Sequence, residues 1–373
     1  MTAAPGLRLP TVATPPGTSL PDRPTVSHPD AMSPEALADA RGNQPKRGLI
    51  GLAFVVPLTV VLSLAADGPV HSLLVLGPII TFGLPFVSAI AFWWEDWPGS
   101  LLRRPWSGLY DTAIVAVGGV LLTMLGQVIV NGPDLIGVFA PGAGHPSTFP
   151  NTLPLGGGVF TVILQLTLVW ERWPLSKLGR IRSGLAAIAL SWLLGLVMWL
   201  LAVKAIAIPA DHYGAWLTSI GLWQVLGYIA LRGWPLSWIS RRWLRLLVGN
   251  VAVIGLGWLT YLLFVHAIGW STIVTIAVNG TGIGCFLLIA MLFEAWPAVR
   301  LTPRPGPGLT IVLVSGVVLT ALLLWLLPLL AGALGLSGLD RWGFTTQVTL
   351  NALSTVVILH VAIWDRWPVR GRP

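Results

Sequence analysis

The chain has 373 residues, of which 55% are hydrophobic and 10% are charged, whereas a soluble domain carries about 25% charged residues. A soluble enzyme is excluded because too few charged side chains remain to cover its surface, and the 42 glycines follow no collagen-like period. The formal net charge of +8 is not gathered in a compact basic tract, so we expect no nucleic-acid partner. The composition predicts an all-α, polytopic integral membrane helical bundle.

Residues 1–45 form the first predicted segment, which is rich in Pro, Ser and Thr. It lacks the apolar stretch of a signal peptide, and its composition cannot bury enough surface to offset the entropy of ordering. We therefore predict a disordered cytoplasmic tail, followed by a transmembrane domain over residues 46–373. One short helix is compatible with this tail, with Ser33 as its cap and Pro34 and Glu35 in its first turn.

From residue 48 onward the chain divides into ten runs without Asp, Glu, Lys or Arg, each 18 to 23 residues long. A hydrocarbon core about 30 Å thick needs roughly 17–25 apolar residues per helix, so each run predicts one membrane-spanning helix. The runs are 48–66, 72–94, 112–131, 153–170, 183–203, 213–231, 246–265, 271–293, 308–328 and 343–364.

A repeated string ends every second run. It has the form Trp-Glu-x-Trp-Pro with variations, and it occupies 94–98, 170–174, 231–235, 293–297 and 364–368. This predicts about ten transmembrane helices arranged as five parallel two-helix repeats, because an even number of crossings returns the chain to the same face. The hairpin units are approximately 46–98, 99–174, 175–235, 236–297 and 298–368. We expect similar hairpins to pack similarly, as a curved bundle or an incomplete ring.

The orientation follows from the distribution of positive charge. Seventeen Lys and Arg lie on the face of the bundle that carries the Trp-Pro strings, including Lys46 and Arg47 before the first run, whereas only Lys204 and Arg341 lie at the opposite ends of the runs. The positive-inside rule therefore predicts cytoplasmic termini and Trp-Pro strings. The chain uses few Lys and many Arg, Ala, Gly and Pro, which is typical of proteins from GC-rich bacteria. We therefore expect a protein of a bacterial inner membrane, whose first partner is the lipid bilayer.

An acidic residue occupies the second position of four strings: Glu95, Glu171, Glu294 and Asp365. A carboxylate near a helix C-terminus faces the negative end of the helix dipole, so a compensating cation is expected. The favoured interpretation of these interfacial carboxylates is a structural latch with the arginines of the linkers. The alternative is a carboxylate ring that binds cations or a partner.

Polar side chains inside the predicted spans are candidate cavity-lining residues, because such groups are costly in lipid. They are Gln127, Gln165, Gln224, Asn279, Gln347 and Asn351. Interhelical hydrogen bonds worth about 0.6–2 kcal/mol each explain the same residues without a ligand. A permease requires that they face one shared cavity.

Metal and catalytic patterns are weak. His71, His212 and His266 lie near the ends opposite the Trp-Pro strings, but their spacing matches no metal motif, so they are weak candidates beside ordinary interfacial residues. The single cysteine, Cys285, allows no cysteine cluster, and no catalytic string is present. We expect no cofactor.

Three functions remain open. The first is a permease or channel-like protein for a small solute of unknown identity. The second is a membrane scaffold or accessory subunit with a protein partner at the cytoplasmic face. The third is a membrane-embedded lipid-processing enzyme that uses interfacial acids such as Glu95 and Glu171.

Overall fold

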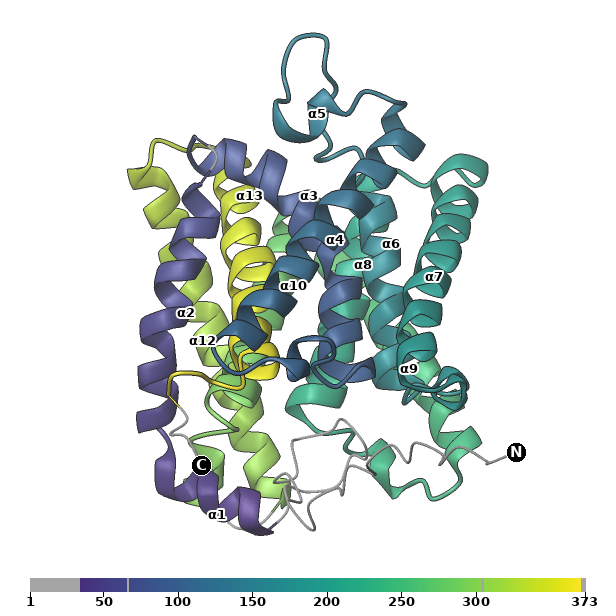
Figure 1. Cartoon of the computed structure of the whole chain (residues 1–373). Helices are drawn as coiled ribbons and strands as arrows, with labels where there is room; N and C mark the ends of the chain where they lie inside the picture. The colour runs from purple at the N-terminus through teal and green to yellow at the C-terminus, as the bar shows by residue number, and fades with distance from the viewer. Residues whose placement is uncertain (1–33, 66, 303–304, 370–373) are drawn as a thin grey trace, which may run out of the picture.

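The computed structural model describes residues 34–65, 67–302 and 305–369, and within these ranges the chain is helical without a named β-strand. Eight helices are long and apolar enough to cross a membrane: Lys46–Leu64, Pro69–Trp93, Trp106–Asn131, Arg180–Ala205, Arg242–Ala267, Thr272–Leu292, Gly306–Ala333 and Asp340–Ile363. The prediction of a helical membrane bundle is therefore confirmed, and the long axes of its helices run in one general direction (Figure 1).

Two of the ten predicted spans are not among these eight helices. Leu153–Val169 is apolar but shorter. The segment formed by α8 (Ala210–Val225) and the π-helical turn Leu226–Ala230 contains Asp211, His212 and Gln224, which lower its hydropathy. Most of α8 is buried by neighbouring helices, and a helix that does not face lipid needs no apolar surface there.

Five helical segments form a closed inner ring by successive contacts. They are α3 (Pro69–Ser88), α6 (Leu153–Leu164), α8, α10 (Thr272–Leu287) and a C-terminal segment. This C-terminal segment comprises α13 (Asp340–Thr346), the π-helical stretch Gln347–Leu353 and α14 (Ser354–Ile358), and it contacts both α10 and α3. The incomplete ring expected from the repeat is therefore not what is observed.

Five outer helices cover this ring. The helices α4 (Trp106–Asn131), α7 (Arg180–Trp199), α9 (Arg242–Tyr261) and α12 (Pro305–Ala333) each pack on the inner helix that precedes them. The fifth position, against the C-terminal segment, is filled by α2 (Lys46–Leu64) from the beginning of the bundle. Outer-helix side chains such as Leu193, Val251 and Val318 are more than half exposed, as expected for residues that face lipid.

Glycines permit close approach between inner and outer helices. A Cβ atom at Gly119 of α4 would lie 2.7 Å from the carbonyl oxygen of Ile79 in α3, and a Cβ atom at Gly195 of α7 would lie 2.7 Å from the amide nitrogen of Val159 in α6. Any larger residue would push the backbones apart. These pairs use the small-residue packing that is common between membrane helices.

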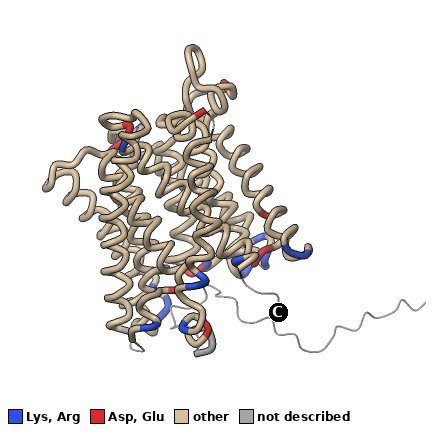
Figure 2. Tube along the Cα trace, turned by 90° about the vertical axis from the view of Figure 1, so that its left-hand side faces the viewer, with Lys and Arg blue, Asp and Glu red and all other residues tan. Residues whose placement is uncertain are grey.

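The two ends of the bundle differ in charge. The α1 end contains α1 (Pro34–Asn43), α11 (Ala298–Leu301) and the Trp-Pro strings, and the α5 end contains the loop 132–152 with α5 (Ile136–Phe139). Most Lys and Arg lie at the α1 end (Figure 2). Residues 34–43 of the predicted tail form α1, while residues 1–33 lie outside the described residues.

Candidate functional site

The first group of polar candidates forms a hydrogen-bonded chain between α6, α8 and α9. Gln224 donates to Oε1 of Gln165 at 2.6 Å and to the carbonyl oxygen of Thr161 at 3.0 Å. Gln165 donates to Oδ1 of Asn250 at 2.7 Å, and Nε1 of Trp170 donates to the same oxygen at 2.8 Å. These polar groups therefore join three helices to one another.

Gln347 and Asn351 form a second and separate group. Asn351 donates to Oε1 of Gln347 at 2.7 Å, and Gln347 points toward the carbonyl oxygen of Leu62 and the hydroxyl of Ser72, each at 3.4 Å. This group connects the C-terminal segment with α2 and α3. It lies where α2 completes the outer layer.

Gln127 and Asn279 lie in two further places. Gln127 donates to the carbonyl oxygens of Asp134 at 3.2 Å and Pro146 at 2.9 Å, and so anchors the loop 132–152. Asn279 of α10 donates to Oγ of Ser219 in α8 at 2.8 Å. The structure thus brings Gln165 to Gln224 and Gln347 to Asn351, and it places Gln127 and Asn279 apart from both pairs.

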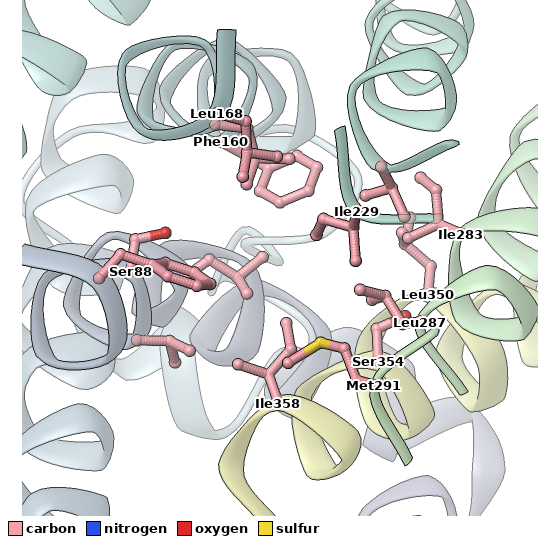
Figure 3. Close-up of a pocket in the computed structure, with 15 residues that line it drawn as sticks. Ser88, Phe160, Leu168, Ile229, Ile283, Leu287, Met291, Leu350, Ser354 and Ile358 are labelled. Atoms are coloured by element: carbon pink, nitrogen blue, oxygen red, sulfur yellow. The ribbon is translucent and has the colours of Figure 1, made fainter. Parts of the chain in front are cut away.

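A cavity of about 30 Å³ lies between the inner helices, roughly the volume of one water molecule. Its lining is almost entirely apolar, with Phe160, Ile229, Ile283, Leu287 and Met291 among the side chains that surround it (Figure 3). None of the six polar candidates lines it. The centre of the ring is therefore packed by apolar side chains.

The five Trp-Pro strings share one backbone conformation. Each follows a five-residue π-helical turn, the second and third residues of each string have positive φ, and the Trp-Pro peptide bond is cis in each. In the first string, the amide of Trp94 donates to the carbonyl oxygen of Ala89, and that of Asp96 donates to the carbonyl oxygen of Ile90. Left-handed residues at a helix C-terminus satisfy the last carbonyl groups and end the helix.

Three of the four acidic string residues form ion pairs with arginine. Glu171 pairs with Arg245 and Arg242, and Asp365 pairs with Arg104 at 3.4 Å. Glu95 is exposed, and its carboxylate has no ion pair among the described residues. Arg180 instead donates to the backbone carbonyl oxygen of Glu95 at 2.8 Å.

Glu294 has the most buried carboxylate of the four, with its side chain 10% exposed. It accepts hydrogen bonds from Gln44 at 2.9 Å, from Arg47 at 3.2 Å and from Arg366. Arg232 occupies the acidic position of the third string; burial lowers the pKa of its guanidinium, and the charge of Glu294 partly opposes this shift. The carboxylate of Glu294 therefore lies in a positively charged environment.

The histidine candidates lie at the α5 end. Nδ1 of His212 lies 2.7 Å from the hydroxyl of Tyr261, and the ring of His266 packs edge-on against the same tyrosine at 5.6 Å between centroids. His71 is not part of this aromatic cluster. Across residues 34–65, 67–302 and 305–369, no three His, Cys, Asp or Glu side chains converge as metal ligands would.

Two residues of α9 that the sequence patterns did not mark as site residues also take part in these polar contacts. Arg245 bonds to Glu171 and Asn250 accepts from Trp170, so both connect α9 with the string at 170–174. Their signal in the sequence is indirect, because a polar residue on an outer helix needs a partner on the inner ring. The Trp170 indole and its bond to Asn250 supply that partner.

No family model, curated protein or solved structure matches the chain. Its helices and their hydropathy define it as a helical, multi-pass membrane protein. Any more specific function must be inferred from its own contacts.

Proposed function

We propose that the chain crosses the membrane ten times, as five two-helix units of one orientation that close into a ring. The support is a constant offset between the first helix of a unit and the strings: in cyclic order, the first helix of four units contacts the string that lies two units earlier. These contacts are Gly48 with Phe293, Gly108 with Trp364, Gly184 with Trp94 and Asn250 with Trp170. In the fifth unit, α12 contacts the turn Leu226–Ala230, which directly precedes the third string.

This topology has a direct test in a chain whose single cysteine is buried. In a Cys285→Ala background, new cysteines at Ser100 and Ser176 report on the α1 end, and cysteines at Asn151 and Ser337 report on the α5 end. We propose a bacterial inner membrane with the α1 end in the cytoplasm. An impermeant maleimide added to spheroplasts should then label positions 151 and 337 and leave positions 100 and 176 unlabelled. The reverse pattern contradicts the proposed orientation. Labelling of only one position of either pair contradicts the repeat.

We further propose that the protein is a membrane scaffold or accessory subunit rather than a permease. The observation that supports this is the centre of the ring, where a cavity of about 30 Å³ is lined by apolar groups. The amide groups of the polar candidates donate instead to one another, to backbone carbonyl oxygens, or to Asn250, Ser72 and Ser219. A solute path needs wetted polar groups along a shared lumen. Hydrogen bonds between helices instead favour a rigid frame.

The partner should bind at the cytoplasmic α1 end and carry acidic groups. Six basic residues there are exposed and form neither an ion pair nor a side-chain hydrogen bond among the described residues, so their charge is available to a partner or to lipid headgroups. They are Lys46, Arg103, Lys177, Arg182, Arg241 and Arg300.

The experiment compares native membranes that contain the wild-type protein with membranes that contain an Arg103→Gln, Arg182→Gln, Arg241→Gln triple variant. We expect crosslinking to capture one companion protein with the wild type and several-fold less with the variant, while Lys204→Gln, at the other end, has no effect. No companion, or equal capture by both proteins, contradicts the proposal.

The permease alternative is tested in the same Cys285→Ala background. Cysteines placed at Gln224 and Asn279 should resist a hydrophilic thiol reagent if these positions lie between packed helices. Rapid labelling of both from the aqueous phase would support a hydrated path and contradict the scaffold.

A further inference from the structure

A second and larger apolar cavity lies on the outside of the bundle. It has a volume of about 250 Å³ and lies near the α5 end, where α2 and α12 stand on either side of α13. Leu327 and Phe344 are buried at its floor, while Leu330 and Leu334 are about half exposed at its edge. We refer to this cavity as the α2–α12 groove.

The volume of the groove is large enough for part of a hydrocarbon chain. An apolar cavity of about 150 Å³ in a protein core can hold a benzene molecule, and this groove is larger. It lies within membrane-spanning helices and is open at its edge, so its neighbour in a membrane is lipid rather than water. An acyl chain therefore matches its chemistry.

A cation lies at the rim of the same groove. Arg341 precedes Phe344 and Val348, which line the groove, by three and seven residues on the same helical face. Its Nε donates to the carbonyl oxygen of Leu336 at 2.9 Å, and its Nη2 lies 3.2 Å from the position of a Cβ at Gly332 of α12. The exposed guanidinium keeps further donors, and it has no ion pair in the described ranges.

Arg341 is one of two Lys or Arg residues at the α5 end within the described part of the chain. The other cation at this end, Lys204, lies over the ring of Trp199 at 5.1 Å.

We propose that the α2–α12 groove is a binding site for one anionic phospholipid of the leaflet at the α5 end. One acyl chain lies in the groove, and Arg341 at its rim binds the phosphate. This site is independent of the scaffold function, since it lies at the end of the bundle opposite the exposed basic residues.

Native mass spectrometry of the full-length protein, delipidated and then titrated with phosphatidylglycerol, tests the site. We expect one tightly bound lipid, with affinity reduced about tenfold by Arg341→Gln because a charge-assisted phosphate contact is lost, and unchanged by Lys204→Gln. Leu330→Trp should block the groove, whereas Leu322→Trp, at a similarly exposed position of α12 outside it, should not. Glycerophosphoglycerol, which has the headgroup without chains, should not displace the lipid.

Two outcomes would overturn the proposal. One is equal lipid binding by wild type, Arg341→Gln and Leu330→Trp, which would describe a non-specific annulus. The other is displacement by glycerophosphoglycerol, which would describe a phosphate site without an acyl chain. Far-UV circular dichroism and the melting temperature of each variant separate lost binding from lost folding.

Discussion

Arg245 and Glu171, which are 74 residues apart in the sequence, are joined by two parallel hydrogen bonds, from Nε to Oε1 at 2.8 Å and from Nη2 to Oε2 at 3.1 Å. This two-pronged geometry is the strongest form of the arginine–carboxylate interaction. It attaches α9 to the string that ends the segment of α6. The pair lies at the bilayer surface and is largely shielded, with side chains 12% and 23% exposed.

The first prediction concerns this ion pair. Glu171→Gln should lower the free energy of unfolding by about 1–3 kcal/mol, because hydrogen bonds to charged groups are lost in a partly buried place. Thermal unfolding in detergent measures the change, and a double-mutant cycle with Arg245→Gln isolates the pair. Glu95→Gln is the matched control and should change nothing; equal effects at positions 95 and 171 would contradict the assignment.

The second prediction concerns the backbone of the strings. Glu95 has a φ of 52°, a region that costs roughly 1–2 kcal/mol for a residue with a Cβ, and its exposed side chain has no ion pair in the described part of the chain. Glu95→Gly should therefore raise the melting temperature. Glu171→Gly removes the same strain, but it also removes the Arg245 contacts, so it should lower the melting temperature.

The third prediction tests how closely outer helices approach the strings. A Cβ atom at Gly184 of α7 would overlap the indole of Trp94, whereas a Cβ at Gly255 of α9 would meet nothing within 4 Å. Gly184→Ala should destabilise the protein by about 1–3 kcal/mol, because a ring fixed by packing cannot move freely. Gly255→Ala should be neutral or stabilising, since alanine favours a helix. Similar melting temperatures for the two variants would contradict the packing.

The fourth prediction is a pH dependence of the loop 132–152. A hydrogen bond with His145, 2.9 Å from Asp134, holds the pKa of the Asp134 carboxyl below its usual value of 3.8. A lowered carboxyl pKa stabilises the loop above pH 3.8, and this contribution disappears as the pH falls through the lower folded-state value. Deuterium exchange of the loop amides, corrected for intrinsic rates, should show protection at pH 5 that decreases below pH 3.8. In the Asp134→Asn variant, the loop amides should show at pH 5 the same reduced protection that the wild-type loop shows below pH 3.8.

The strings and the helices could be predicted because their signals are local. A Trp-Pro pair ends a helix wherever it occurs, and an apolar run of the right length is helical in lipid. The partner of each acid could not be predicted in this way. Glu294 pairs with Arg47, 247 residues away, because closure of the ring brings α2 beside the fourth string.

The division into inner and outer helices corresponds to a difference in the polar residues that the helices carry. The outer helix α12 is almost uniformly apolar, whereas α8 carries buried Ser219 and Gln224. Buried polar groups can be supported only where a neighbouring helix supplies a partner. Which neighbour does so depends on lateral packing, and so Gln127 bonds to a loop while Gln165 bonds to Gln224.

The position of α2 sets an order of events during synthesis. Its binding surface on Gln347–Leu353 is made almost 300 residues later, which corresponds to a delay of roughly 15–60 s at ribosomal elongation rates of 5–20 residues per second. Throughout this interval the first helix of the bundle has entered the bilayer without its final neighbour. The bundle is therefore completed only when α2, its first helix, acquires its last neighbour. A nascent chain stalled before residue 340 would leave the surface of α2 that later binds Gln347–Leu353 exposed to the insertion machinery and to membrane proteases.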